Sequence, residues 1–136
     1  MVELSRRLAL EVGGASVDAL GLKHWAHVMR AYADGDTARA LRTIQDARKG
    51  SRPRPSVWMR LMAALAEITT ELEWTREATK AVDEYRDAAL QAGDRNHELT
   101  ADLLAARLLA QGGRPEAALD ALIEVSLELP AWSSEV

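Results

Sequence analysis

Residues 23–41, KHWAHVMRAYADGDTARAL, decide the fold class because they contain one helix, a turn and the start of a second helix. The first helix is indicated by apolar and aromatic side chains spaced three or four residues apart, which places them on one face. They are Trp25, Val28, Met29 and Tyr32. Gly35 and Asp36 interrupt that spacing and favour a turn. The stretch therefore predicts an antiparallel helical hairpin.

The composition of the whole chain favours helices throughout. A chain of 136 residues is long enough for one domain with its own core. The apolar share of 48% is rich in Ala and Leu and contains no Phe, and such residues favour helices over strands. No segment has the pattern of a strand, so the predicted fold class is all-α.

Glycine and proline divide the chain into about seven predicted helices. Gly13-Gly14 is expected to end a first helix, and the linker-like stretch GSRPRPS, residues 50–56, separates two hairpins because its prolines resist helix. A turn is expected near residues 74–75, and Pro130 is expected to stop the last helix. The predicted single domain, 1–136, consists of an N-terminal helix 1–14, a hairpin 16–49, a long irregular hairpin 55–92, a hairpin 97–130 and a tail 131–136.

The sequence also excludes cysteine chemistry and indicates where in the cell the protein is found. There is no cysteine, so disulfides, thiolate metal sites and a cysteine nucleophile are excluded. Neither the N-terminus MVELSRRLALEVGG nor any other segment has an apolar run of the length of a signal peptide or a bilayer span. A cytoplasmic location is therefore expected.

The last hairpin helps to decide between a four-helix bundle and a repeat, because both show the same helical periodicity. Residues 113–130, GRPEAALDALIEVSLELP, have small, large and apolar residues and a terminal proline in the order of the second helix of a tetratricopeptide repeat. They are Ala118, Leu122, Val125 and Pro130. In the preceding helix, Ala105-Ala106 and Leu109 stand where that family has Leu-Gly and Tyr, and Asp102 replaces its Trp. The segment resembles one complete repeat of about 34 residues.

The two other hairpins show the same resemblance. The first matches the family's W-x2-L-G-x2-Y motif and its second-helix pattern, with a link one residue short; the matching residues are Trp25, Val28, Met29, Tyr32, Ala40, Ile44 and Ala47. The middle hairpin has the right order in its first helix, with the second-helix residues about seven positions late; these residues are Trp58, Leu61, Met62, Leu65, Ala81, Tyr85 and Ala88. The resemblance covers residues 23–130 and implies antiparallel hairpins stacked as a right-handed superhelix.

The resemblance also implies a function. Residues 90–122 look most like the repeats attached to bacterial transcription activators and diguanylate cyclases, where they act as partner- or ligand-sensing modules in signalling. In such repeats the first helix of each hairpin lines a groove, and the matching positions here are Lys23, Ala26, Arg30, Met59, Ala63, Leu103 and Arg107. Three cations with apolar surface between them suit an extended or helical peptide with an acidic end. An ordinary solvated surface would show the same residues.

Other candidate sites carry less weight. His24 and His27 have the i, i+3 spacing of a shared metal ion, but a stable site needs three or four ligands, so surface histidines are expected. Carboxylates four residues apart, at Glu67 and Glu71 and again at Asp83 and Asp87, are typical of solvated helix faces. The sequence therefore indicates no cofactor, no metal and no catalysis, although an unrecognised enzyme site is a rival hypothesis.

Charge is distributed unevenly along the chain, whose net charge is -4. Residues 39–60 contain seven basic residues and one acid, a net +6, whereas residues 61–136 contain fifteen acids and six bases, a net -9. The basic segment could contact nucleic acid, which is the less favoured partner because the protein as a whole is acidic. Complementary charge, and Trp132 beyond the last predicted helix, also allow a homodimerisation scaffold or a segment of a longer protein.

Overall fold

The computed structural model describes the backbone of residues 2–128 and the side chains of residues 16–128. The described residues form six helices and no strand, which confirms the predicted all-α fold class. The helices are α1 (Val2–Ala33), α2 (Thr37–Lys49), α3 (Pro55–Glu71), α4 (Thr75–Ala92), α5 (Arg95–Gln111) and α6 (Pro115–Glu128). The stop expected at Pro130 and the tail 131–136 with Trp132 lie outside the described residues.

The first helix differs from the prediction. The expected boundary at Gly13-Gly14 is wrong, because α1 continues through both glycines and ends only at Ala33. Glycine inside a helix costs about 1 kcal/mol relative to alanine, which does not stop a helix whose flanks are rich in Leu, Ala, Glu and Arg. The described chain therefore has six helices in place of about seven, and the first hairpin begins within α1.

The other turns lie near their predicted positions and have clear local causes. Asp36 caps α2 by accepting a hydrogen bond of 3.1 Å from the backbone N–H of Arg39. Gly93 ends α4 with a left-handed φ of 68°, which a residue without Cβ adopts readily. Pro55 and Pro115 are the first residues of α3 and α6, where a missing N–H costs nothing. Three residues join α3 to α4.

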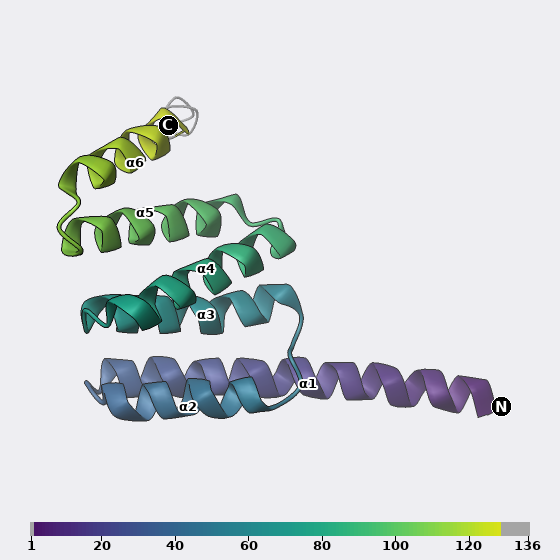
Figure 1. Ribbon diagram of the computed structural model, residues 1–136. Coiled ribbons are helices and arrows are strands. Elements are labelled where there is room, and N and C mark those ends of the chain that lie inside the picture. The colour runs from purple at the N-terminus through teal and green to yellow at the C-terminus, as the bar shows by residue number, and fades with distance from the viewer. Residues whose placement is uncertain (1, 129–136) are drawn as a thin grey trace.

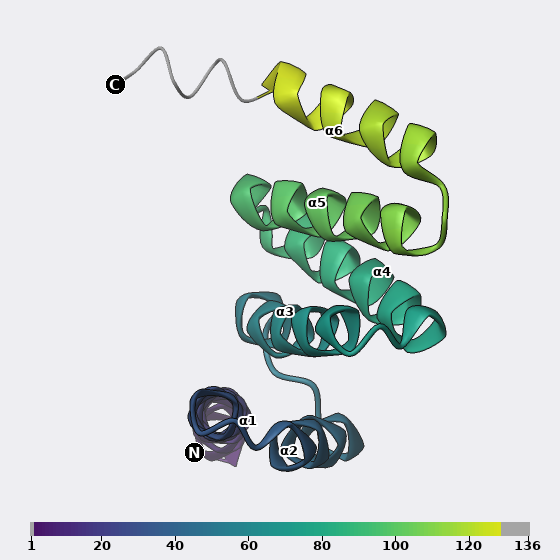
Figure 2. The same cartoon turned by 90° about the vertical axis from the view of Figure 1, so that its left-hand side faces the viewer.

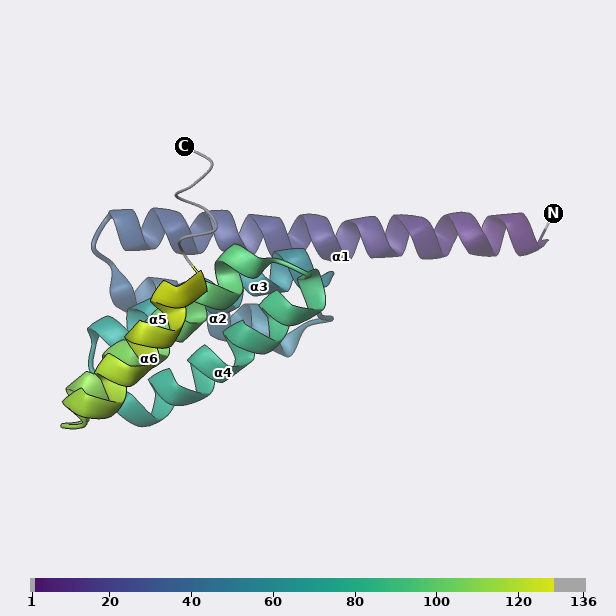
Figure 3. The same ribbon diagram turned by 90° about the horizontal axis from the view of Figure 1, so that it is seen from above.

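The helices form three antiparallel hairpins stacked one on the next, α1 with α2, α3 with α4 and α5 with α6 (Figure 1). Seen from the side, α1 and α3 lie on one side of the stack, and α2 and α4 lie on the other (Figure 2). Neighbouring hairpins meet through α1 and α3, α3 and α5, and also through α2 with α3 and α4 with α5. The N-terminal part of α1 extends beyond the stack (Figure 3).

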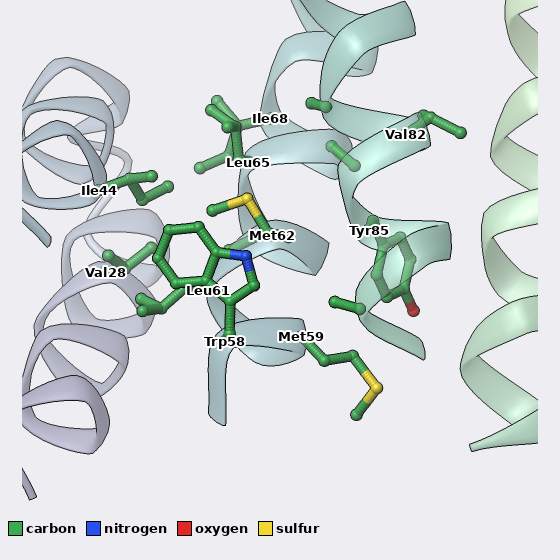
Figure 4. Close-up of a cluster of buried hydrophobic side chains, with 14 of the residues drawn as sticks. Val28, Ile44, Trp58, Met59, Leu61, Met62, Leu65, Ile68, Val82 and Tyr85 are labelled. Carbon is green, nitrogen blue, oxygen red and sulfur yellow. The ribbon is translucent and has the colours of Figure 1, made fainter. Parts of the chain in front are cut away.

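The core is centred on α3, which lies between the first hairpin and α4 (Figure 4). Leu61 and Met62 are fully buried and belong to one cluster with Val28 of α1, Ile44 of α2 and Tyr85 of α4. Because neighbours cover α3 on several sides, its sequence is apolar almost all the way round. Two threonines are also buried there, and their hydroxyls donate to carbonyls of the preceding turn, as seen at Thr69 and Thr70.

The connection between α2 and α3 is fastened to α1. Pro53 is buried, and a Cβ on Gly21 would lie 2.9 Å from Pro53 Cγ and 2.9 Å from Val57 Cγ1. Glycine therefore allows this close approach. Asp18 accepts hydrogen bonds from the backbone N–H of Arg54 (2.8 Å) and from its Nε (2.7 Å). The pKa of Asp18 lies below its usual range. The largest cause is the hydrogen bond from the backbone N–H of Arg54, and the second is the hydrogen bond from its guanidinium.

Candidate functional site

A hollow of about 230 Å³ opens on the face made by the first helices of the three hairpins. It is lined by Trp25 and Met29 of α1, by Arg60, Ala63, Ala64 and Glu67 of α3, and by His97 of α5. The hollow therefore joins residues that lie far apart in the sequence. Aromatic, apolar and charged groups around one concavity are typical of binding sites.

The α1 wall of the hollow follows from helical spacing. Trp25 and Met29 are four residues apart, so they are neighbours on the surface of α1, and both line the hollow; Trp25 also packs against the core. The Arg60 guanidinium lies over the indole of Trp25, 5.2 Å from the ring centroid, and the two groups attract each other through a cation–π interaction. Within the described residues, Arg60 makes no ion pair. Its charge is therefore free to meet an acidic group.

Tyr32 extends the same face towards the end of α3. Its hydroxyl donates to both carboxylate oxygens of Glu71, at 2.6 Å each. This hydrogen bond, followed by burial and by the charges of Glu71 and Glu67, raises the pKa of Tyr32 to about 12. The charge of Arg107 opposes that rise, which places α5 near the same point. Glu71 is therefore already bound to Tyr32 within the chain.

The sequence patterns missed His97. Its backbone N–H donates to the capping residue Asp94 (3.1 Å), and its Nδ1 lies 2.5 Å from the hydroxyl of Tyr85. Burial, the largest cause, raises the pKa of Tyr85 to about 12. The signal that could have found His97 is its place in the first turn of α5, after a capping aspartate. A side chain there faces the preceding hairpin.

The structure separates the predicted groove residues into three groups. Ala63 lines the hollow, as expected of a groove residue. Lys23, Arg30, Leu103 and Arg107 are exposed, as is Ala26. Met59 is only 4% exposed and belongs to the core, so its predicted contact with a partner is wrong. Met59 belongs to the core cluster that α3 shares with α4 (Figure 4), which explains its burial.

Arg30 is also engaged within its own helix. Its Nε lies 3.4 Å from Asp34, four residues later, in an exposed ion pair. Such surface pairs contribute little and exchange readily for other partners. Arg30 therefore keeps its capacity to bind an acidic group.

The histidine pair and the carboxylate pairs are spread over exposed surfaces. His27 is exposed and His24 is half-buried. No group of three or more His, Asp or Glu side chains that could hold a metal ion occurs among residues 16–128. Asp83 and Asp87 are exposed on α4. Of the histidine and carboxylate pairs, only Glu67 lines the hollow.

Other hollows lie elsewhere in the stack, and the two described next lie between its helices. One of about 490 Å³ lies between α2, α3 and α4, where the Arg48 guanidinium and the Glu84 carboxylate on its wall already pair at 2.8 Å. Another of about 360 Å³ lies between α4 and α5 and has apolar walls that include Val82 and Leu108. The first also has an aromatic ring, Trp74, and cations that make no ion pair among the described residues, Arg42 and Lys80. Its walls come from two hairpins only, whereas the hollow of Trp25 and His97 joins all three.

The basic segment 39–60 is partly neutralised by contacts within the chain. Four of its cations lie next to acids: Arg39–Asp34 (3.1 Å), Arg48–Glu84 (2.8 Å), Lys49–Asp46 (3.9 Å) and Arg54–Asp18 (2.7 Å). Arg52 lies over the ring of Trp58, at 4.5 Å. These contacts weaken the positive field that a nucleic acid would need.

Comparisons with protein-family models, with curated proteins and with solved structures found no match. The resemblance to tetratricopeptide repeats thus rests on the residues of this chain. In the part of the chain that the structure describes, no helix combines the length and the apolar character that crossing a bilayer requires.

Proposed function

We propose that the protein is a regulatory module that binds a segment of another protein and carries out no catalysis of its own. The supporting observation is the hollow between α1, α3 and α5, which joins Trp25, Arg60 and His97 from three hairpins. Its volume of about 230 Å³ is below the roughly 300–1,000 Å³ of small-molecule pockets. It is suited to one anchoring side chain of a peptide.

The charges around the hollow define the chemistry of the partner. Arg60 forms one wall, and Lys23 and Arg107 are exposed on the neighbouring first helices. Glu67 lies on the wall as well. We therefore infer a peptide with an apolar anchor and an acidic group beside it, directed towards Arg60. The resemblance to tetratricopeptide repeats supports this role, and a cytoplasmic location in bacterial signalling is part of the same proposal.

Peptide display against the full chain tests the proposal. Selected peptides should share an apolar residue next to Asp or Glu. Ala63→Met places a larger side chain in the hollow and should weaken their binding by more than about tenfold. Arg60→Glu should remove the preference for an acidic residue.

The matched control is Lys80→Glu, an exposed position on α4 outside this hollow. It should leave binding by fluorescence polarisation unchanged. Circular dichroism checks that each variant is folded. If Ala63→Met and Arg60→Glu bind the selected peptides as tightly as the wild type, the hollow is not the binding site.

A further inference from the structure

The helix α1 has a second apolar face, roughly opposite the face that packs on the stack. Val28 and Ala31 are fully buried against the other helices. The opposite face consists of exposed residues, including Leu22 and Met29, which are 41% and 43% exposed. Its members are Ala19, Leu22, Ala26, Met29 and Ala33. We call this set the α1 seam.

The spacing within the α1 seam is that of a coiled coil. Its members follow one another at alternating intervals of three and four residues, which is the seven-residue repeat with apolar first and fourth positions. In the sequence the same spacing continues upstream at Ala15, Val12 and Leu8. The repeat thus spans nearly four heptads, enough to indicate a coiled coil. Gly13 and Gly14 fall at positions of the repeat outside the seam.

The backbone of α1 gives an independent reason for a partner. The N-terminal part of the helix extends beyond the stack, and no other described helix lies beside it (Figures 1 and 3). Isolated helices of about 12–15 residues are marginal in water, even when alanine-rich. Two glycines weaken this one further. A second helix along the seam would supply the missing apolar contacts.

We propose that α1 forms a parallel two-stranded coiled coil with α1 of a second copy of this chain. The residues on the two sides of the seam select this occupant and this direction. Asp18 and Trp25 lie on one side, and Lys23 and Arg30 lie on the other. In a parallel pair, Lys23 of the second copy comes close to Asp18, whose carboxylate Arg54 of its own chain already holds, and Arg30 comes close to Trp25, which already lies under Arg60. An antiparallel pair would bring the two basic sides together.

The proposed coiled coil borders the proposed peptide site, because Trp25 and Met29 line the hollow. Leu22 and Ala26 do not line the hollow, although Met29 lies at its edge. Small residues at three of the five seam positions allow the two helices to approach closely, and Leu22 and Met29 fill the positions between them. A dimer would hold two hollows at a fixed separation.

Sedimentation equilibrium of the full chain tests the association. The wild type should be a dimer, and Ala26→Glu, which places two carboxylates in the seam, should raise the dimer dissociation constant more than about tenfold. Leu20→Glu is the matched control, because Leu20 is 51% exposed on the same helix but outside the seam. It should stay dimeric. A monomeric wild type at high concentration, or a dimer lost in Leu119→Glu on α6 and kept in Ala26→Glu, would overturn the proposal.

Cross-linking tests the direction of the helices. The chain has no cysteine, so Ala19→Cys and Ala33→Cys each introduce a single thiol. In a parallel, in-register pair both variants should oxidise to covalent dimers, because equal seam positions face each other. In an antiparallel pair at most one position lies next to its own copy. Covalent dimers from only one variant, or from neither, would therefore overturn the parallel arrangement.

Discussion

Tyr32 fastens the end of α1 to the end of α3 through one hydroxyl group. The hydroxyl donates to both oxygens of Glu71 at 2.6 Å, although the residue is 36% exposed. The chain contains one other tyrosine, Tyr85, which is buried beside His97. Both pKa values are raised to about 12, by hydrogen bonding at Tyr32 and by burial at Tyr85. The ionisation of tyrosine therefore reports on the Tyr32–Glu71 hydrogen bond and on the burial of Tyr85.

An absorbance titration should show little tyrosinate in the native protein near pH 10, the ordinary pKa, and ionisation of both residues around pH 12. Because folding raises both pKa values, their contribution to stability is fully present below pH 10 and is lost as the pH rises through about 12. In urea both should titrate near the ordinary value. In the Tyr32→Phe variant, Tyr85 is the one tyrosine that titrates. Ionisation near pH 10 in this variant would contradict the burial of Tyr85, and a tyrosine that ionises near pH 10 in the wild type alone would contradict the hydrogen bond of Tyr32 to Glu71.

Replacing Gly21 by alanine should destabilise the protein, although alanine has the higher helix propensity. Alanine favours a helix by about 1 kcal/mol over glycine. A Cβ at position 21, however, would lie 2.9 Å from both Pro53 and Val57. We expect Gly21→Ala to lower the free energy of unfolding by about 1–3 kcal/mol, as overpacking does. Urea unfolding measures the change.

The matched control for Gly21 is Gly14→Ala in the same helix, which should raise the free energy of unfolding by up to about 1 kcal/mol. Opposite signs at the two positions are the diagnostic result. Equal stabilisation by both alanines would mean that α1 and the connection to α3 are not in close contact.

Single residues were predictable where the immediate helix decides their environment. Ala63, one of the predicted groove residues, is half-buried and lines the hollow. Met59, another of them, is 4% exposed, because α3 lies between two neighbours and has few free faces. His97 enters the site through the stacking of α5 on the middle hairpin, a tertiary contact that its place after the capping Asp94 does not determine by itself.

At the scale of the element, equivalent helices differ in what covers them. Ile44 on α2 and Leu122 on α6 occupy the same position in the repeat pattern. Ile44 is fully buried where α2 meets α3, whereas Leu122 is 43% exposed on the last described helix. Neighbouring residues of α6 are exposed as well, among them Leu119, Ile123 and Leu127. The second helix of a hairpin is thus buried by the hairpin that follows it in the stack.

The difference in burial between Ile44 and Leu122 predicts that substitution by alanine destabilises the protein more at position 44 than at position 122. Ile44→Ala should lower the free energy of unfolding by about 2–5 kcal/mol, since it leaves a cavity in the core. Leu122→Ala should lower it by less than about 1 kcal/mol, as exposed positions do. Urea unfolding followed by circular dichroism compares the two. Similar losses would show that α6 is covered in solution, by a second copy or by another protein.

The limits of α1 show why element boundaries were harder to predict than element types. Proline and capping residues set the start of α2, α3, α5 and α6 by local chemistry. Gly13-Gly14 carries only a propensity cost, which a long helix overcomes. A glycine pair therefore marks a weak point in a helix and needs a turn or a proline beside it to mark an end.

At the scale of the whole molecule, periodicity and turn residues predicted an all-α chain of hairpins. They could not predict which faces meet. The hollow depends on how α1, α3 and α5 lie next to one another, and the basic segment is partly neutralised by acids that lie on other helices, such as Asp18 and Glu84. Both features depend on how the helices stack in three dimensions. A count of charges along the sequence considers each segment by itself and leaves out the acids on neighbouring helices.

The stack also has a kinetic consequence. Each described helix contacts only helices one or two places away in the chain. Folding therefore requires no closure of a long loop, and its rate should be limited by local steps, as in other chains of low contact order. The first hairpin can form while the rest of the chain is still being synthesised, and each later hairpin then docks on a surface that already exists. The order of synthesis and the order of assembly coincide.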